Sequence, residues 1–187
     1  AELAAIQLHP ARPAGVNEPT EAGVEGSERI LRLVSEAGAE DLVICLLSGG
    51  GSALLPSPAA GITLADKQQV TRHLSGAGAN LAALNTVRKH LSRVKGGGLL
   101  RACRAGQLAT LVISDVIGDP LDVIASGPTV PDSSTAEQAL AVLEKYDAAA
   151  AGISDRVFEV LRTPPERMTP GCRHSMHVIG NNEAAID

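Results

Sequence analysis

Three short segments of the chain have the hydrophobicity of β-strands. Leu42–Leu47 and Leu108–Ile113 are almost continuous apolar runs, and His174–Ile179 is a third segment of the same length. Apolar runs of this length are typical of strands that are buried on both faces of a parallel sheet. Polar and glycine residues follow each segment and mark the point where the strand ends.

Between these strands, apolar residues recur at helical spacing. The pattern predicts a short helix over 99–103 and longer helices over residues 20–37, 63–75, 80–91, 135–146 and 155–161. Strands that alternate with helices favour an α/β fold with a mostly parallel sheet covered on both faces.

Two segments between these elements carry proline. A helix that begins at Ala53 is cut short by Pro56 and Pro58, and residues 124–132 predict an extended loop. We find no internal repeat in the chain.

The segment Ser48-Gly49-Gly50-Gly51-Ser52 directly follows the first predicted strand. Its glycines and serines predict a tight turn that presents backbone N–H groups and hydroxyls, which suits an anion such as phosphate. It is not a Walker loop, because no lysine follows the glycines, and Leu54 stands where the dinucleotide fingerprint requires glycine. A flexible linker is the alternative, but linkers do not usually follow a buried strand.

A dense basic cluster lies in the middle of a chain whose net charge is -5. Arg88 and Lys95 can clamp phosphate or carboxylate groups, and glycine beside Lys95 permits the close approach of a ligand. A solvated helix face is the alternative interpretation of these charges. The candidate binding residues around them are Asn85, Lys89, Gly96 and Gly97.

Two carboxylates, Asp115 and Asp119, follow the second predicted strand. Oxygen ligands at this position suit Mg²⁺ with bound waters, whereas N-capping and turn formation are the alternative. Because ligands bind at the carboxyl ends of parallel strands, we expect the polar clusters to form one site. Further candidates there are Ser126, Gly127, Thr129 and Asn181.

Composition excludes several function classes. The negative net charge gives no electrostatic reason to expect nucleic acid or an anionic membrane, and no stretch is long enough to span a bilayer. Tyr146 and Phe158 are the only aromatic residues, so aromatic platforms for base stacking are absent. The three cysteines have neither disulfide nor zinc spacing, and free thiols favour a reducing, cytoplasmic location.

Five motifs in order resemble the glycerate 2-kinase family, whose second domain is called MOFRL. They are Ser48–Leu54, Asn85–Ser92, Lys95–Gly97, Ser114–Asp119 and Ala125–Asp132. Each motif is weak alone, but five in this order and spacing are specific. The resemblance covers most of the chain.

The resemblance implies a two-domain enzyme that phosphorylates the small molecule D-glycerate with ATP and Mg²⁺, giving 2-phosphoglycerate. It implies a Rossmann-like three-layer α/β/α sandwich, with the active site in the cleft between domains. We expect residues 1–187 to be part of the larger amino-terminal domain, truncated at both ends and inactive alone, without the family's leading Gly-Lys-Ala segment and without its second domain. A homodimer is compatible with the sequence.

Phosphoryl transfer needs positioning and charge compensation, so the residues are assigned roles on that basis. Lys95 and Arg88 offset charge on the transferred group or hold the glycerate carboxylate. Asp115 and Asp119 bind Mg²⁺, or one of them accepts the hydroxyl proton. The nucleotide- and substrate-binding residues are Ser48, Gly49, Gly50, Gly51, Ser52, Asn85, Lys89, Gly96, Gly97, Ser126, Gly127, Thr129 and Asn181.

Three other functions are weighed against the kinase. Part of the family is labelled hydroxypyruvate reductase, but the missing dinucleotide fingerprint counts against a reductase. A ligand-binding domain without chemistry is the second alternative. A serine hydrolase is the third: Ser52, Asp115 and His174 or His177 occur in the α/β-hydrolase order, but the nucleophile elbow is broken at Leu54.

Overall fold

The structure is a computed structural model that describes residues 6–16, 18–114, 116–163 and 169–181. The elements follow in the order α1 Glu21–Glu36, β1 Leu42–Leu47, α2 Gly51–Leu54, α3 Leu64–Gly76, α4 Leu81–His90, α5 Gly98–Ala102, β2 Gln107–Ile113, the 3₁₀ turn η1 Ile124–Ser126, α6 Ala136–Lys145, α7 Asp155–Arg162 and β3 Arg173–Gly180.

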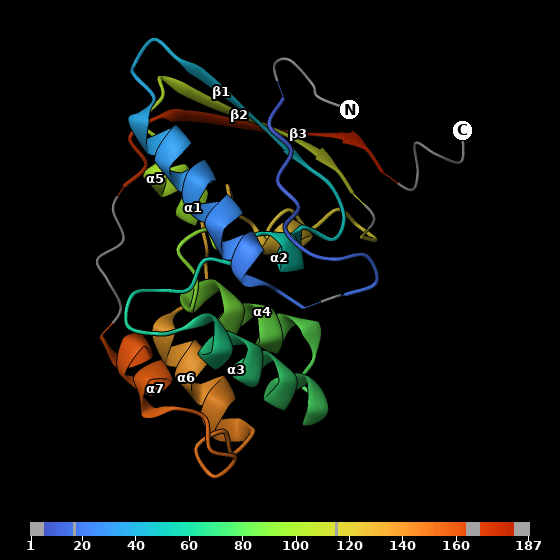
Figure 1. Ribbon diagram of the computed structural model, residues 1–187, viewed down its shortest axis with the longest axis vertical. Coiled ribbons are helices and arrows are strands. Elements are labelled where there is room, and N and C mark those ends of the chain that lie inside the picture. Colours follow the sequence, from blue (N-terminus) through green and yellow to red (C-terminus); the bar gives the residue numbers. More distant parts are fainter. Residues whose placement is uncertain (1–5, 17, 115, 164–168, 182–187) are drawn as a thin grey trace.

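The three strands form one parallel sheet in the order β1-β2-β3 (Figure 1). In this sheet Val43 pairs with Leu108, and Leu108 pairs in turn with His174. The predicted α/β fold with a parallel sheet is confirmed. The predicted strand bounds hold for β1 and agree within one residue for β2 and β3.

One expectation about the first strand is wrong for the described residues. Val43 and Cys45 pack into the core formed with α1 and α5, but Leu42, Ile44 and Leu46 alternate onto the opposite face and are 57%, 57% and 72% exposed. The described helices α1 and α5 therefore cover one face of the sheet, and its apolar opposite face is open.

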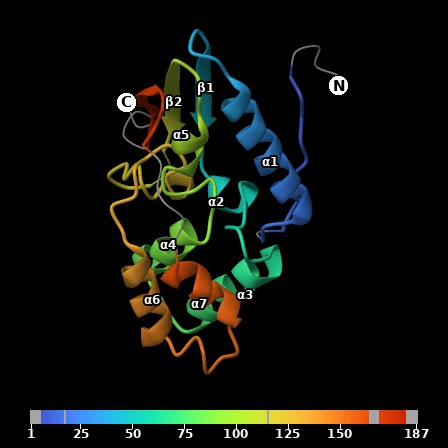
Figure 2. The same ribbon diagram turned by 90° about the vertical axis from the view of Figure 1, so that its left-hand side faces the viewer.

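A second core lies among α3, α4, α6 and α7, below the sheet in Figure 1 and seen from the side in Figure 2. Side-chain caps fix the starts of α3, α4 and α6. Thr63 and Asp66 form a capping box on α3, as Thr135 and Gln138 do on α6. The predicted helices are confirmed, and the largest fully buried side chains of this core are those of Val70, Leu74, Val87, Leu91, Leu143, Val157 and Leu161.

Two short elements connect the sheet to the helical cluster. The helix α2 begins at Gly51, two residues before the expected start, and ends before Pro56. It contacts η1, which replaces part of the extended loop expected over 124–132. No helix in the described part of the chain combines the length and apolarity that crossing a membrane requires.

Glycine is required where the loop between α1 and β1 crosses the start of β2. A Cβ atom on Gly106 would lie 1.9 Å from the carbonyl oxygen of Ala39. The backbone of Gly106 also donates to Gly38 O and accepts from Arg173 N, so the loop cannot move aside freely.

Gly106→Ala is therefore expected to lower the free energy of unfolding by ~1–3 kcal/mol, the usual cost of overpacking. The matched control is Gly76→Ala, because a Cβ there meets nothing within 4 Å. That control should be neutral or stabilise by roughly 0.5–1 kcal/mol. Urea unfolding followed by circular dichroism measures both, and equal effects would contradict the close approach at Gly106.

Candidate active site

The polar segments that follow the three strands come together, as the sequence predicts. Beyond β1, Ser52 Oγ lies 3.0 Å from the Oγ of Ser126, which belongs to η1. At the ends of β2 and β3, Asn181 Nδ2 donates to Asp119 Oδ2 at 2.6 Å. Residues from three of the five motifs thus make contacts beyond the carboxyl ends of the strands.

The Lys95 motif is bonded to the turn around Ser126 through the backbone. Gly96 N donates to Ser126 O at 3.0 Å, and Gly97 N donates to Gly127 O at 2.7 Å. Both glycines have positive φ, and a Cβ on Gly97 would lie 2.9 Å from Val130 O. The glycines therefore serve close backbone packing, in addition to any approach of a ligand.

The turn at Ala125-Ser126-Gly127 has three successive left-handed residues, with φ values of 52°, 61° and 60°. This conformation costs an alanine or a serine on the order of 1–3 kcal/mol. Ser126 is held in place because its Oγ bonds to Ser52 and, at 3.4 Å, to Asn85 Oδ1. A strained turn that its neighbours fix in one shape is typical of functional sites.

The glycines of the loop after β1 are also required by backbone conformation and packing, in addition to the predicted binding of phosphate. Gly50 is left-handed, with φ 81°, and a Cβ on Gly51 would lie 2.8 Å from the Cβ of Ala125. Gly51 thus lets α2 approach the strained turn. Ser48, Gly49 and Gly50 are exposed and stay predicted phosphate ligands.

Lys95 joins these loops through its side chain. It is 3% exposed, and its Nζ donates to the carbonyl oxygens of Ser52 at 2.9 Å and Ala125 at 3.5 Å. Burial, together with the nearby Arg88, lowers the pKa of Lys95 to about 7. Near neutral pH the amine can therefore gain or lose a proton.

A cavity of about 70 Å³ lies beside Lys95, with room for a group on the order of two water molecules. Lys67, Arg88 and Lys95 all line it, and burial lowers the pKa of Arg88 as well. The sequence predicts Arg88 and Lys95 as site residues but not Lys67. The missed signal is spacing: Lys67 shares the inner side of α3 with Val70 and Leu74, where an apolar residue is expected.

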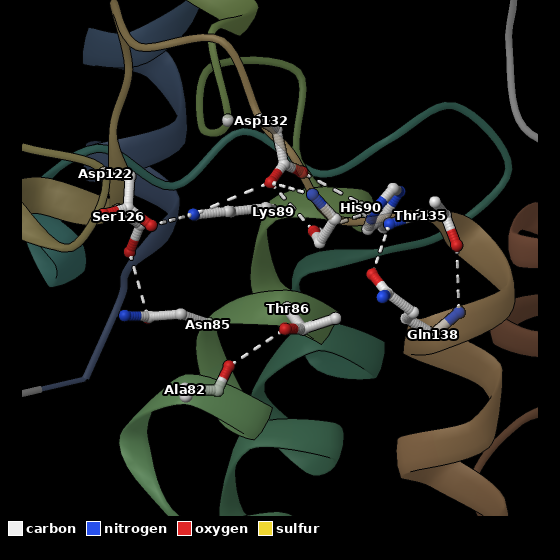
Figure 3. Close-up of polar contacts among 12 residues, drawn as sticks. Ala82, Asn85, Thr86, Lys89, His90, Asp122, Ser126, Asp132, Thr135 and Gln138 are labelled. Atoms are coloured by element: carbon white, nitrogen blue, oxygen red, sulfur yellow. Dashed lines mark hydrogen bonds and ion pairs between the residues drawn. The ribbon is translucent and has the colours of Figure 1, made fainter.

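Lys89 lies in a separate network that fixes the loop before α6 (Figure 3). Its Nζ is 3.1 Å from Asp122 Oδ2 and 3.6 Å from Asp132 Oδ1, and His90 Nε2 is 3.5 Å from the other oxygen of Asp132. The side chains of Lys89 and Asp132 are buried. Lys89 stays a predicted binding residue, but its charge is already compensated.

The other predicted residues occupy supporting positions. Asn85 is buried and bonded to Ser126, and Thr129 is fully buried and accepts from Thr110 Oγ1 at 3.1 Å. Ser52 bonds to Ser126 instead of a histidine, which does not fit the nucleophile–base pair of a serine hydrolase.

The metal prediction rests on Asp115 and Asp119. Asp115 lies outside the described residues. Asp119 is half-buried, and hydrogen bonds from Ser114 and Asn181 lower the pKa of its carboxyl. Within the described ranges no three His, Cys, Asp or Glu side chains gather as a metal site. One ionised carboxylate nevertheless fits Mg²⁺, which proteins commonly bind through one or two carboxylates plus phosphate oxygens and water.

Comparison with known proteins identifies the family. Residues 4–162 match the family described as "Domain of unknown function (DUF4147)". The chain belongs to this family. It is 42% identical over 174 residues to a D-glycerate 2-kinase of Thermotoga maritima. The matched segment covers 93% of this chain and 40% of that protein.

Two further matches agree with this membership. A crystal structure of glycerate kinase from Thermotoga maritima has a TM-score of 0.78 and 44% identity, covering 91% of this chain and 40% of that one. A putative hydroxypyruvate reductase of Agrobacterium vitis is 48% identical over 128 residues, 68% of this chain and 29% of that protein. The predicted membership in the glycerate 2-kinase family is confirmed. The chain spans less than half the length of these relatives.

Removal of the buried acid in the Lys89 network should be costly. Asp132→Ala leaves Lys89 with only the half-exposed Asp122, so we expect a loss of roughly 3 kcal/mol in unfolding free energy, as for a broken buried ion pair. The control Asp122→Ala should cost less than about 1 kcal/mol, because Asp132 still pairs with Lys89. Chemical unfolding of both variants measures the difference, and similar losses would contradict the assignment of Asp132 as the main partner.

The low pKa of Lys95 predicts a rise in stability with pH. Between about pH 7 and its ordinary pKa of 10.5, the unfolded chain binds a proton at Lys95 that the folded chain does not, so the free energy of unfolding increases with pH. Lys67, whose pKa is lowered by burial and by the charges of Lys95 and Arg88, acts in the same direction.

Urea unfolding at several values between pH 7 and 9 tests this rise, which Lys95→Met should reduce. The window ends at pH 9, because burial raises the pKa of Cys45 from 9.0 to about 11 and this thiol acts in the opposite direction above pH 9. The same pH slope in both proteins would contradict the buried position of the Lys95 amine.

Proposed function

We propose that this chain contributes the substrate-binding part of a glycerate 2-kinase active site, which phosphorylates D-glycerate with ATP to give 2-phosphoglycerate and ADP. The observation that carries the proposal is the cavity lined by Lys67, Arg88 and Lys95, to which three of the five motifs contribute lining residues. No salt bridge in the described part of the chain involves these three cations. A carboxylate or a phosphoryl group supplies a counter-charge for these three cations.

In the proposed reaction the 2-hydroxyl oxygen of glycerate attacks the γ-phosphorus of ATP. The bond from that phosphorus to the bridging oxygen breaks, ADP leaves, and the hydroxyl proton passes to a carboxylate. Asp119 and Asp115 are the predicted acceptors, and the low pKa of Asp119 keeps it ionised near neutral pH.

The chain's residues divide this work between charge compensation and positioning. Lys95 and Arg88 hold the glycerate carboxylate or offset charge on the transferred group, in a buried setting where a charge interaction is stronger than in water. The Ser48–Ser52 loop binds phosphate through its backbone, and the turn at Ser126 forms a rigid wall. Mg²⁺, when bound at Asp119, offsets the negative charge of the phosphate oxygens.

A reductase is the second candidate, because one relative is named a putative hydroxypyruvate reductase. Leu54 in place of the fingerprint glycine argues against nicotinamide binding through that motif.

Release of ADP decides between these functions. The complete gene product that carries this sequence is incubated with ATP and Mg²⁺, with and without D-glycerate, and ³¹P NMR identifies the product. Oxidation of NADH with hydroxypyruvate is measured beside it. ADP release that depends on glycerate supports the kinase, and NADH oxidation without ADP release overturns it. Nucleotide binding without either reaction favours the ligand-binding domain.

Lys95→Met should lower kcat/KM at least ~100-fold, because it removes a charge placed against the transferred or carboxylate group. The free energy of unfolding should change by far less than the free-energy equivalent of this loss in kcat/KM, because the substitution also removes an uncompensated buried charge. The control is Lys145→Met on the exposed side of α6. Unchanged turnover of Lys95→Met would remove Lys95 from the mechanism.

A further inference from the structure

Lys67 is buried in a way that nothing in the fold explains. The residue is 7% exposed, and its Nζ is the one buried side-chain nitrogen or oxygen, among the described residues, without a hydrogen-bond partner. The side chain starts from α3, in line with Val70 and Leu74 of the apolar core. Lysine is almost never fully buried unless it is paired.

The charged groups around the Lys67 amine are mostly positive. Arg88 on α4 and Lys95 after α4 line the same cavity, and Arg72 lines it from α3 itself. The acid among the lining residues is Glu18, whose carboxylate lies 3.6 Å from the Arg72 guanidinium, with both side chains more than half exposed. The remaining lining residues are Pro19, Ser52, Ala53, Pro56, Gln68 and Thr71.

An apolar residue in place of Lys67 would stabilise the folded chain. A buried ammonium without partners carries a desolvation penalty of several kcal/mol, and two neighbouring cations add repulsion. Accordingly, burial first, and then the charges of Lys95 and Arg88, lower the pKa of Lys67 well below its ordinary value. Burial and the two neighbouring cations thus both disfavour the charged form of Lys67.

An anion in the cavity reverses this preference. It supplies the missing acceptor for Nζ, compensates the charges of Arg88 and Lys95, and favours the ammonium over the amine. Lys95 responds in the same way, because its own pKa lies near neutrality. The cavity volume of about 70 Å³ accommodates a group of the size of a carboxylate or a phosphoryl group.

We propose that Lys67 is the buried anchor of an anion site shared with Arg88 and Lys95, and that it takes up a proton when a carboxylate or phosphoryl group enters the cavity. The proton comes from the solvent, and no covalent bond other than N–H is formed. The site deepens the proposed function when the anion is glycerate, but the site itself does not depend on that activity.

Isothermal titration calorimetry of the complete gene product at pH 8 tests the proposal with two probes. D-glycerate presents a carboxylate, and sulfate stands in for a phosphoryl group; neither titrates at this pH. Each titration is repeated in two buffers of different ionisation enthalpy, because the difference in heat gives the number of protons taken up. The variants are Lys67→Met, which keeps the length of the side chain, and the exposed control Lys145→Met.

We expect net proton uptake by the unchanged protein with at least one probe. Lys67→Met should weaken that binding at least about tenfold, the worth of one hydrogen bond to a charged group, and should take up fewer protons. The control should bind as the unchanged protein does. Binding of sulfate alone assigns the site to phosphoryl groups and leaves the glycerate function unsupported, whereas binding of glycerate alone assigns it to carboxylates.

Three results would overturn the proposal. They are no binding of either probe, binding without proton uptake, and equal affinity and uptake in Lys67→Met and the unchanged protein. The two-buffer measurement on the unchanged protein needs no variant, so it still decides the matter if Lys67→Met does not fold. If the unchanged protein binds sulfate with proton uptake but releases no ADP with glycerate, the kinase function is rejected and the anion site is supported.

Discussion

The attachment of Lys95 and its two glycines to the strained turn is the interaction on which the site depends. The backbone of Gly96 and Gly97 bonds to Ser126 and Gly127, while the Lys95 ammonium bonds to carbonyl oxygens on both Ser52 and Ala125. One short segment thereby fixes the loop that follows β1 and the turn that follows β2. These bonds add to the direct hydrogen bond between Ser52 and Ser126, which lie 74 residues apart in the chain.

The same segment concentrates features that oppose stability. Ala125 and Ser126 have left-handed backbone conformations, and three cations share one cavity without a carboxylate paired to any of them in the described ranges. Apolar side chains in place of the three cations, and turns without left-handed alanine or serine, would make the fold more stable. Such costs are typical of sites where a ligand supplies the missing charge, because preorganised groups then need no rearrangement when it binds.

Much of the fold follows from local pattern. The apolar run Leu42–Leu47 predicts β1 correctly because continuous hydrophobicity bounded by an aspartate and glycines is unambiguous. The convergence of the loops follows from the parallel sheet alone. The role of Gly51 could not be predicted, because its need for glycine comes from Ala125, a neighbour in space and not in sequence.

Two features of the site that were not predicted also have physical reasons. By residue type Lys67 looks like a solvated lysine, although its spacing from Val70 and Leu74 places it on the buried side of α3. The left-handed residues Ala125 and Ser126 carry no sequence signal, because neither is a type that favours positive φ. In each case contacts distant in sequence override the local preference.

The position of the cavity lets its ligand link two parts of the fold. Lys67 and Arg88 project from the helical cluster, whereas Ser52 and Lys95 belong to the loops at the edge of the sheet, and each half has its own apolar core. A bound anion therefore acts as an electrostatic cross-link between two separate apolar cores. The cooperativity of unfolding, in which both halves melt together or one after the other, then depends on the anions that surround the protein.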